Sequence, residues 1–308
     1  MKKLQKVIIL GDPGLDGATA LSLALADPNL EVLAALACAG NVSAEQATRN
    51  MQAVLARLDP PRWPRLGVAP VVDYDVDGRF WHGANGMVGL ELPSAPPLNA
   101  PSSDKLLIEL ARKFPGEISL LNMGPCTVLA QALDREPGLV DLLQNVVVVG
   151  GAWRDPGTIL PGVEFHFHCD PQAARRVIHA GFRLQLVTLD ATRSLVVSPA
   201  MMTGWNELSA LGEFMRELLP PALRLAEMSH GIEGVAMDDV GALLALVRPD
   251  GCKMRSIPVD IETQGEITKG MSIFDTRRNN HGGKANINVI LQIESAVFEQ
   301  YFNDLIRH

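Results

Sequence analysis

The sequence predicts an α/β fold in which an open, mostly parallel central sheet is flanked by helices. Short apolar segments of strand length alternate with segments of helical periodicity, beginning with residues 6–10 and 18–26. The apolar segments lack the alternation of a half-exposed strand, and are therefore typical of strands buried on both faces of a parallel sheet. No repeat or linker interrupts this pattern, so we expect seven or eight strands in a single domain spanning residues 1–308.

Most predicted strands lead through turn-forming residues into a predicted helix. The expected strands are residues 6–10, 30–39, 68–72, 118–122, 146–149 and 184–189. The expected helices are residues 18–26, 44–58, 105–114, 127–133, 171–180, 198–228, 238–247 and 296–306, with interruptions near Gly212 and at Pro220 and Pro221. Ser43 suits the cap of the second helix. Residues 254–293 are expected to form strands and a hairpin, with a loop at residues 277–283.

Two irregular stretches, residues 73–103 and 155–169, stand out between the periodic segments. A long loop inside a compact domain is usually functional or disordered, and we expect the first stretch to form the rim of an active site. Aromatic side chains that could stack on a planar ligand lie in or beside these stretches: Phe80, Trp81, Trp153, Phe165 and Phe167. Packing in the core or at the rim is the commoner role for any single one of them, and Trp81, next to His82, is the strongest candidate.

Composition and charge exclude several classes of protein. The 308 residues are 47% hydrophobic with a net charge of −8, which predicts a large core and argues against phosphate contacts to nucleic acid. The four cysteines are widely spaced, so neither a disulfide framework nor a zinc site is indicated. No apolar stretch is long enough for a signal peptide or a membrane helix. We therefore expect a cytoplasmic protein that binds neither nucleic acid nor membranes.

The loop after the first predicted strand carries two acids, Asp12 and Asp16. In an open α/β sheet, ligands bind where the carboxyl ends of strands meet helix N-termini. Two carboxylates four residues apart could bind a cation, hold sugar hydroxyls or accept a proton from water. The alternative is purely structural, with Asp16 capping the helix and Asp12 shaping the turn. The sequence alone leaves both interpretations open.

Other strand-end loops add amide, acid and carbonyl oxygens. The combined set is Asp12, Asp16, Asn41, the Met123 carbonyl, Glu164, His166 and Asp239. This set has no glycine-rich phosphate cradle, and therefore suits a neutral polyhydroxyl ligand such as a sugar better than a phosphate.

Ordered motifs, none of which is specific alone, run along nearly the whole chain: Asp12-Pro13-Gly14-Leu15-Asp16, Gly40-Asn41 with Thr48-Arg49-Asn50, His82-Gly83, Gly124-Pro125 with Thr127, Gly150-Gly151, Glu164-Phe165, Asp170-Pro171, Leu189-Asp190 and Gly270-Met271. Together they resemble the motifs of the nucleoside hydrolases of the inosine-uridine preferring type. The resemblance implies an open α/β fold and hydrolysis of the N-glycosidic bond of ribonucleosides to base and ribose. It also implies a homodimer or homotetramer.

The resemblance further implies roles for individual residues. Asp12 matches the acid that binds calcium and acts as general base, while Asp239 and the Met123 carbonyl match further calcium ligands. Asp16 and Glu164 match residues that hold the ribose. The expected substrate-binding residues are Asp16, Asn41, Trp81, His82, Glu164, His166 and Asp238.

The chain also departs from the family pattern within the same pocket. Leu10 and Gly17 replace acids of the first loop, and the acid missing at Gly17 is a principal calcium ligand. The histidine expected before Asp239, proposed in the family to protonate the leaving purine, is Asp238. Two ribose-contacting asparagines fall at His166 and Thr158.

Three hypotheses follow from these departures. Asp238 could restore the charge lost at Gly17 and keep a weakened calcium site, because calcium tolerates variable oxygen geometry. Alternatively, Asp12 could act as base without a metal, with His166 or His168 as a new acid or ribose contact; both would share a face only if the stretch is extended. Finally, the chain could be a degenerate member that binds a nucleoside, a ribose-like ligand or a protein partner without turning it over.

Overall fold

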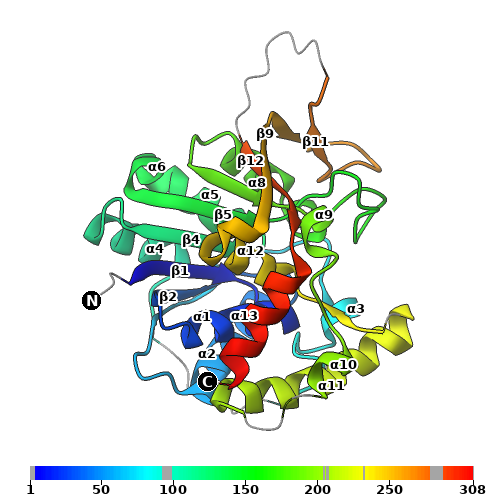
Figure 1. The fold of residues 1–308 in the computed structure, drawn as a ribbon. Coiled ribbons are helices and arrows are strands. Elements are labelled where there is room, and N and C mark those ends of the chain that lie inside the picture. The colour runs from blue at the N-terminus through cyan, green and yellow to red at the C-terminus, as the bar shows by residue number, and fades with distance from the viewer. Residues whose placement is uncertain are drawn as a thin grey trace.

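In the computed structural model the chain is organised around an eight-stranded sheet (Figure 1). The structure describes residues 4–91, 99–203, 205, 208–231, 233–277 and 287–307. The strands, in spatial order, are β3 (Arg65–Gly67), β2 (Leu30–Ala37), β1 (Gln5–Gly11), β4 (Ile118–Met123), β5 (Leu143–Val149), β6 (Leu184–Val187), β12 (Ile287–Ile293) and β9 (Cys252–Ile257). All neighbours are parallel except β12 and β9, which confirms the predicted fold class.

The uniformly apolar strands are buried on both faces of this sheet. In β1, Val7 and Ile9 belong to one apolar cluster and Ile8 and Leu10 to the other, and all four side chains are fully buried. Successive side chains of a strand point to opposite faces, so both faces of β1 must be covered by helices. This explains why the sequence of the strand shows no polar alternation.

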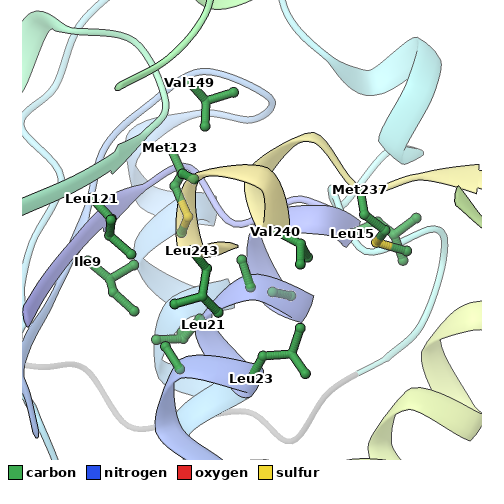
Figure 2. Packing of buried hydrophobic residues seen from close by; sticks show 14 of the residues in the cluster. Ile9, Leu15, Leu21, Leu23, Leu121, Met123, Val149, Met237, Val240 and Leu243 are labelled. Atoms are coloured by element: carbon green, nitrogen blue, oxygen red, sulfur yellow. The ribbon is translucent and has the colours of Figure 1, made fainter. Parts of the chain in front are cut away.

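Helices cover both faces of the sheet. One cluster contains side chains of α1 (Leu15–Ala26), α2 (Ala44–Leu58), α11 (Ala210–His230), α12 (Asp238–Val247) and α13 (Ser295–Arg307). The other contains side chains of α4 (Ser103–Lys113), α5 (Thr127–Arg135) and α8 (Pro171–Ile178). Figure 2 shows the first cluster, in which side chains from the sheet, α1 and α12 pack together.

The remaining elements are short. They are α3 (Arg79–His82), α6 (Leu139–Leu142), α7 (Phe165–Cys169), α9 (Leu189–Thr192), α10 (Pro199–Met202), a 3₁₀ helix (Pro249–Gly251), the β7–β8 pair (Val196–Val197 and Val235–Ala236) and the β10–β11 pair (Val259–Ile261 and Ser272–Phe274). The antiparallel β10–β11 pair is the predicted hairpin. The loop predicted at residues 277–283 lies, apart from residue 277, outside the described residues.

The third predicted strand is misplaced. Residues 68–72 were expected to form it, but β3 ends at Gly67, and Val68 makes only an isolated bridge to Ser102. The next backbone N–H, that of Ala69, donates to the Thr48 hydroxyl at 3.1 Å instead of to a strand. Pro70 has no N–H to donate. An apolar composition therefore could not make this segment a strand.

The long helical region also differs from its prediction. The chain is not helical throughout residues 198–228, because α10 ends at Met202 and α11 begins at Ala210. Within α11 there is no break at Gly212, which lies in the first turn, and the helix runs through Pro220 and Pro221. The buried side chains of Phe214, Leu218 and Ala222 anchor it on both sides of the prolines. Tertiary packing thus offsets the loss of two N–H donors.

The direction of strand order reverses at β1. The chain moves from β1 to β2 and β3 on one side and then returns to β4 on the other. Loops after β1, β2 and β4 consequently converge at one edge of the sheet, which is where ligands bind in open α/β proteins. Among the described residues, no helix is both long and apolar enough to cross a membrane.

Candidate active site

A cavity of about 390 Å³ lies at this edge of the sheet. Its volume is within the range of roughly 300–1,000 Å³ that is typical of small-molecule sites. All the predicted substrate-binding residues line it: Asp16, Asn41, Trp81, His82, Glu164, His166 and Asp238. Asp12, Met123 and Asp239 do not line the cavity and are buried. The structure therefore brings the predicted residues together in two groups, a lining and a set buried near it.

Asp12 directly follows β1 and is 1% exposed. Its Oδ2 accepts a hydrogen bond from the Asn41 backbone N–H at 2.6 Å, and the Asn41 side-chain amide donates to the Asp12 carbonyl at 3.2 Å. A Cβ on Gly40 would lie 1.9 Å from Oδ2, so only glycine leaves room for this contact. Asp12 Oδ1 has no hydrogen-bond partner among the described residues. One carboxylate oxygen is thus fixed by a hydrogen bond, and the other accepts none from the described residues.

The start of α1 shows whether Asp16 caps the helix. The helix begins at Leu15 with Gly14 as its N-cap, so Asp16 lies inside the first turn and does not cap the helix. Its Oδ1 accepts a hydrogen bond from the adjacent Gly17 N–H, at 3.1 Å. The carboxylate also lines the cavity. The capping alternative is therefore wrong for Asp16.

His82, at the end of α3, contacts the same helix start. Its Nδ1 accepts a hydrogen bond from the Leu15 N–H at 3.3 Å. A Cβ on Gly14 would lie 2.6 Å from this nitrogen, so Gly14 is needed for the close approach. Burial lowers the pKa of His82. The ring is then neutral at physiological pH, with its proton on Nε2, because Nδ1 acts as the acceptor.

Residues 165–169 form helix α7 rather than an extended segment. Glu164 is its N-cap, and the carboxylate accepts from the N–H groups of His166 at 2.8 Å, Phe167 at 3.0 Å and Gly151 at 3.3 Å. Side chains two positions apart on a helix point about 200° apart around its axis, so His166 and His168 do not share a face. His168 Nδ1 instead contacts the Lys269 carbonyl at 2.8 Å. His168 is therefore not part of the cavity lining.

His166 lies between two acids. Its Nε2 is 3.6 Å from Asp12 Oδ1, and its Nδ1 is 3.4 Å from Glu164 Oε1. Burial alone would lower the pKa of His166, but the Asp12 and Glu164 carboxylates outweigh it and raise the pKa to about 10. The ring therefore carries a positive charge at neutral pH.

Asp238 and Asp239 begin α12 and are held differently. Asp238 Oδ1 accepts a hydrogen bond from the Thr192 hydroxyl. Burial raises the pKa of Asp238 to about 6, and the acid with the largest further effect is Asp16. Asp239 is 2% exposed, and burial raises its pKa well above the usual range. Asp238 is thus associated with Thr192 and Asp16 at the cavity wall.

The predicted aromatic residues divide into lining and packing residues. Trp81 and Phe165 line the cavity, with ring centroids 5.7 Å apart in an edge-on contact. Phe80 is 64% exposed and contacts the edge of Trp81. Trp153 packs against Phe274, and Phe167 is completely buried in the core. Two of the five candidates can therefore meet a ligand in the cavity.

Several lining residues were not predicted as part of a site. Arg193 follows α9 and forms an ion pair with Asp155. Small and apolar residues of α11 and the β7–β8 pair complete the wall: Val196, Ala222, Ala226, Gly234, Val235 and Ala236. Their sequence resembles any packed helix or strand and carries no signal of a ligand. Only their tertiary placement makes them part of the cavity.

The residues present do not fit the calcium site that the resemblance implies. Asp12 and Asp239 each have one buried carboxylate oxygen without a hydrogen-bond partner, which would suit a cation. The Met123 side chain packs in the apolar cluster, so this residue offers only its carbonyl (Figure 2). Calcium requires about six to eight oxygen ligands, and Gly17 contributes no side-chain oxygen. In the described part of the chain, no three His, Cys, Asp or Glu side chains could hold a metal ion together.

The geometry also gives no support to compensation by Asp238. Its carboxylate contacts Thr192, and its strongest acidic neighbour is Asp16 rather than Asp12. The position that lacks a carboxylate lies beside Asp239, because a Cβ on Gly17 would be 3.0 Å from Asp239 Oδ2.

Comparison with known proteins identifies the family. A family model described as inosine-uridine preferring nucleoside hydrolase matches residues 7–300. The chain is 30% identical over 298 residues to the non-specific ribonucleoside hydrolase RihC of Escherichia coli O9:H4, covering 96% of both chains. It is 31% identical over 277 residues to an uncharacterized protein, C1683.06c, of Schizosaccharomyces pombe, covering 88% of this chain and 89% of that one.

Solved structures show the same fold. The purine-preferring ribonucleoside hydrolase from Gardnerella vaginalis superposes with a TM-score of 0.88 at 24% identity, covering 98% of this chain and 99% of its own. The plant nucleoside hydrolase PpNRh1 superposes with a TM-score of 0.90 at 23% identity, covering 98% of both. At these identities the likeness establishes the fold alone. Together with the family model and the ribonucleoside hydrolase relatives, it shows that the chain belongs to the inosine-uridine preferring nucleoside hydrolases, a family of glycosidases.

Proposed function

We propose that this protein hydrolyses the N-glycosidic bond of ribonucleosides to free base and ribose, with Asp12 as the general base. The observation that carries the proposal is the state of the Asp12 carboxylate. It is buried at the carboxyl end of β1, one oxygen is fixed by the Asn41 N–H, and the other has no hydrogen-bond partner among the described residues. An oriented carboxylate with an oxygen that accepts no hydrogen bond from the protein is suited to accept a proton from water.

The reaction needs one water molecule and no covalent intermediate. The bond between the anomeric carbon and the base nitrogen breaks, and its electron pair leaves with the base, which takes up a proton from solvent. Water adds to the anomeric carbon and passes its proton to Asp12. Positive charge develops on the ribosyl group, where nearby carboxylates stabilise it. Asp16 and Glu164, which line the cavity, are the carboxylates available for this role and for contacts to the ribose hydroxyls.

The base would lie against the apolar part of the cavity. Trp81 and Phe165 offer ring surfaces there, and aromatic rings stack on one another favourably. His82 lines the same cavity, and its neutral ring can donate a hydrogen bond from Nε2. We assign Trp81 and His82 to the base and Asp16, Asn41, Glu164 and His166 to the ribose. Asp238 completes the wall beside Thr192.

Binding without turnover is the alternative. Gly17 and Asp238 stand where the family pattern has a principal calcium ligand and an acid, and both groups act in the transition state. A protein that has lost them could retain a cavity that binds a nucleoside. This alternative is an outcome of the test below.

The test is ribose release from inosine, uridine, cytidine and adenosine, with nucleoside affinity measured in parallel by calorimetry. We expect turnover on at least one nucleoside, and a loss of about 100-fold or more in Asp12→Asn, because a general base contributes roughly 10²–10⁴-fold. Asp59→Asn, at the end of α2, is the control and should retain wild-type turnover. Binding of a nucleoside without any ribose release would favour the alternative.

Other features of the protein remain proposals. We propose a single domain, because the central sheet takes strands from residues 5–11 and 287–293 near opposite ends of the chain. A homodimer or homotetramer and a cytoplasmic location are predicted from the resemblance and the composition. The net charge of −8 supports a small-molecule substrate rather than nucleic acid.

A further inference from the structure

Three buried carboxylates lie in or beside the cavity and need compensation. Asp12, Glu164 and Asp239 are 1%, 4% and 2% exposed. Burying a charge is costly unless it is paired or hydrogen-bonded. Glu164 accepts from three backbone N–H groups, but Asp12 accepts from one, and a carboxylate oxygen of both Asp12 and Asp239 has no hydrogen-bond partner among the described residues. Asp239 can meet this cost by keeping a proton, because burial raises its pKa, whereas Asp12 needs a positive charge from another source.

His166 is the side chain placed to supply this charge. One ring nitrogen is 3.6 Å from Asp12 Oδ1 and the other is 3.4 Å from Glu164 Oε1, so each faces a different carboxylate. The basic side chains that line the cavity are His82, His166 and Arg193. Arg193 is paired with Asp155, and His82 accepts a hydrogen bond from Leu15. Within the described residues, only His166 forms ion pairs with Asp12 and Glu164.

Position 17, where the family pattern has a principal calcium ligand, is a glycine and offers no side chain. A Cβ added to Gly17 would lie 3.0 Å from Asp239 Oδ2. A carboxylate at position 17 would add oxygen ligands beside Asp239, whereas glycine adds none. The His166 ring also lies 3.6 Å from Asp12 Oδ1, beside the carboxylate oxygen that would otherwise be open to a cation. Gly17 and His166, two departures from the family pattern, therefore both disfavour the binding of calcium.

We propose that the His166 side chain takes the place of a divalent cation in this pocket, so that the protein holds no resident calcium. The inference deepens the proposed function and rests on it for its catalytic meaning. The ring keeps the Asp12 and Glu164 carboxylates oriented, and Asp12 accepts the proton of water without a metal beside it. Calcium content is a property of the protein without substrate, so it can be measured whether or not the protein turns over a nucleoside.

The deciding experiment is done on the wild-type protein. Calcium is measured by elemental analysis after purification in calcium-containing buffer and removal of free ions, and the Tm is recorded with EDTA and with calcium. We expect much less than one calcium per chain and no change in Tm between the two conditions. About one calcium per chain, or a Tm that falls in EDTA, would overturn the proposal. Nucleoside turnover is recorded separately, and its failure would refute the proposed function without touching this result.

A pair of double variants tests whether positions 17 and 166 cause the loss of calcium. Gly17→Asp with His166→Asn restores the family pattern at both positions and should bind calcium. Binding at about 100 times the Kd should raise the Tm by about 5 °C. The matched control, Gly17→Asp with His168→Asn, keeps the His166 ring and removes a histidine that contacts the Lys269 carbonyl instead. We expect no calcium-dependent change in its Tm.

The outcomes separate the proposal from its alternatives. Equal calcium binding by the two double variants would show that His166 does not exclude the metal, and would contradict the proposal. Absence of binding by a folded Gly17→Asp/His166→Asn variant would also contradict it. If that variant does not fold, the wild-type measurement alone decides. A merely structural role for His166 predicts a changed Tm in the variants but no gain of calcium binding.

Discussion

Replacing Gly40 by alanine should misplace the Asp12 carboxylate without altering any polar group. A Cβ at position 40 would lie 1.9 Å from Asp12 Oδ2 and 2.7 Å from Asp12 Cγ, far inside normal contact distances. It would also lie 2.9 Å from Pro125 Cδ, so the new atom cannot move freely away from Asp12. Either the Asp12 carboxylate or the loop after β2 must therefore shift by about an ångström.

Two costs follow from this shift. Overpacking of a core site costs about 1–3 kcal/mol. Loss of the 2.6 Å hydrogen bond from the Asn41 N–H to Oδ2 adds about 1.5–3 kcal/mol, because the acceptor is a buried carboxylate. We expect Gly40→Ala to lower the free energy of unfolding by about 2.5–6 kcal/mol if both costs apply in full. A displacement of about 1 Å should also reduce kcat/KM by about 100-fold.

Urea denaturation and steady-state kinetics with the best nucleoside would measure these effects. Gly138→Ala is the matched control, because its φ is −72° and its Cβ would meet only the flexible Glu136 side chain, at 3.1 Å from Oε1. We expect wild-type kinetics and stability from this control. Wild-type stability and kcat/KM in Gly40→Ala would refute the argument that Gly40 is required for the placement of Asp12.

Further predictions concern the cavity wall, the core and the surface. Trp81→Ala should raise KM by about tenfold at most through loss of an aromatic contact worth about 0.5–1.5 kcal/mol, and an unchanged KM would remove Trp81 from the site. Tyr301→Phe should lower the free energy of unfolding by about 1.5–3 kcal/mol, since the Tyr301 hydroxyl donates to buried Asp27 at 2.9 Å; unchanged urea stability would contradict this. Burial alone would raise the pKa of Asp260, but hydrogen bonds from Arg175 and His179 lower it to about 2. The resulting stabilisation is therefore present above about pH 4 and lost as the pH falls toward 2. Because the Asp260 side chain is 43% exposed, Asp260→Asn should cost less than about 1 kcal/mol at pH 7, and the difference in Tm from wild type should shrink by pH 3.

Local patterns in the sequence were sufficient to predict the type of fold and the place of the site. The apolar segments by themselves predict burial, because consecutive apolar side chains such as those of Val7, Ile8, Ile9 and Leu10 point to both faces of the sheet, and both faces must then be covered. Turn-forming residues after each strand then predicted which side chains lie at the carboxyl edge. The predicted substrate-binding residues, which came from these strand ends, from the long irregular stretch and from the family resemblance, all line one cavity.

Long-range contacts decided what these patterns could not. The Ala69 N–H donates a hydrogen bond to the hydroxyl of Thr48, which is distant in sequence, so the strand does not continue past β3. Packing of its buried side chains keeps α11 helical across Pro220 and Pro221. Glu164 caps α7 and so turns His166 and His168 in different directions.

The chain by itself therefore determined the α/β class, the edge of the sheet that carries the site and the kinds of side chain gathered there. Only the tertiary structure decided which partner each of those side chains has: Asn41 for Asp12, Thr192 for Asp238, and a pair of carboxylates for His166. The physical reason is that secondary structure follows from periodicity over neighbouring residues, whereas hydrogen bonds and ion pairs depend on groups brought together from distant parts of the chain.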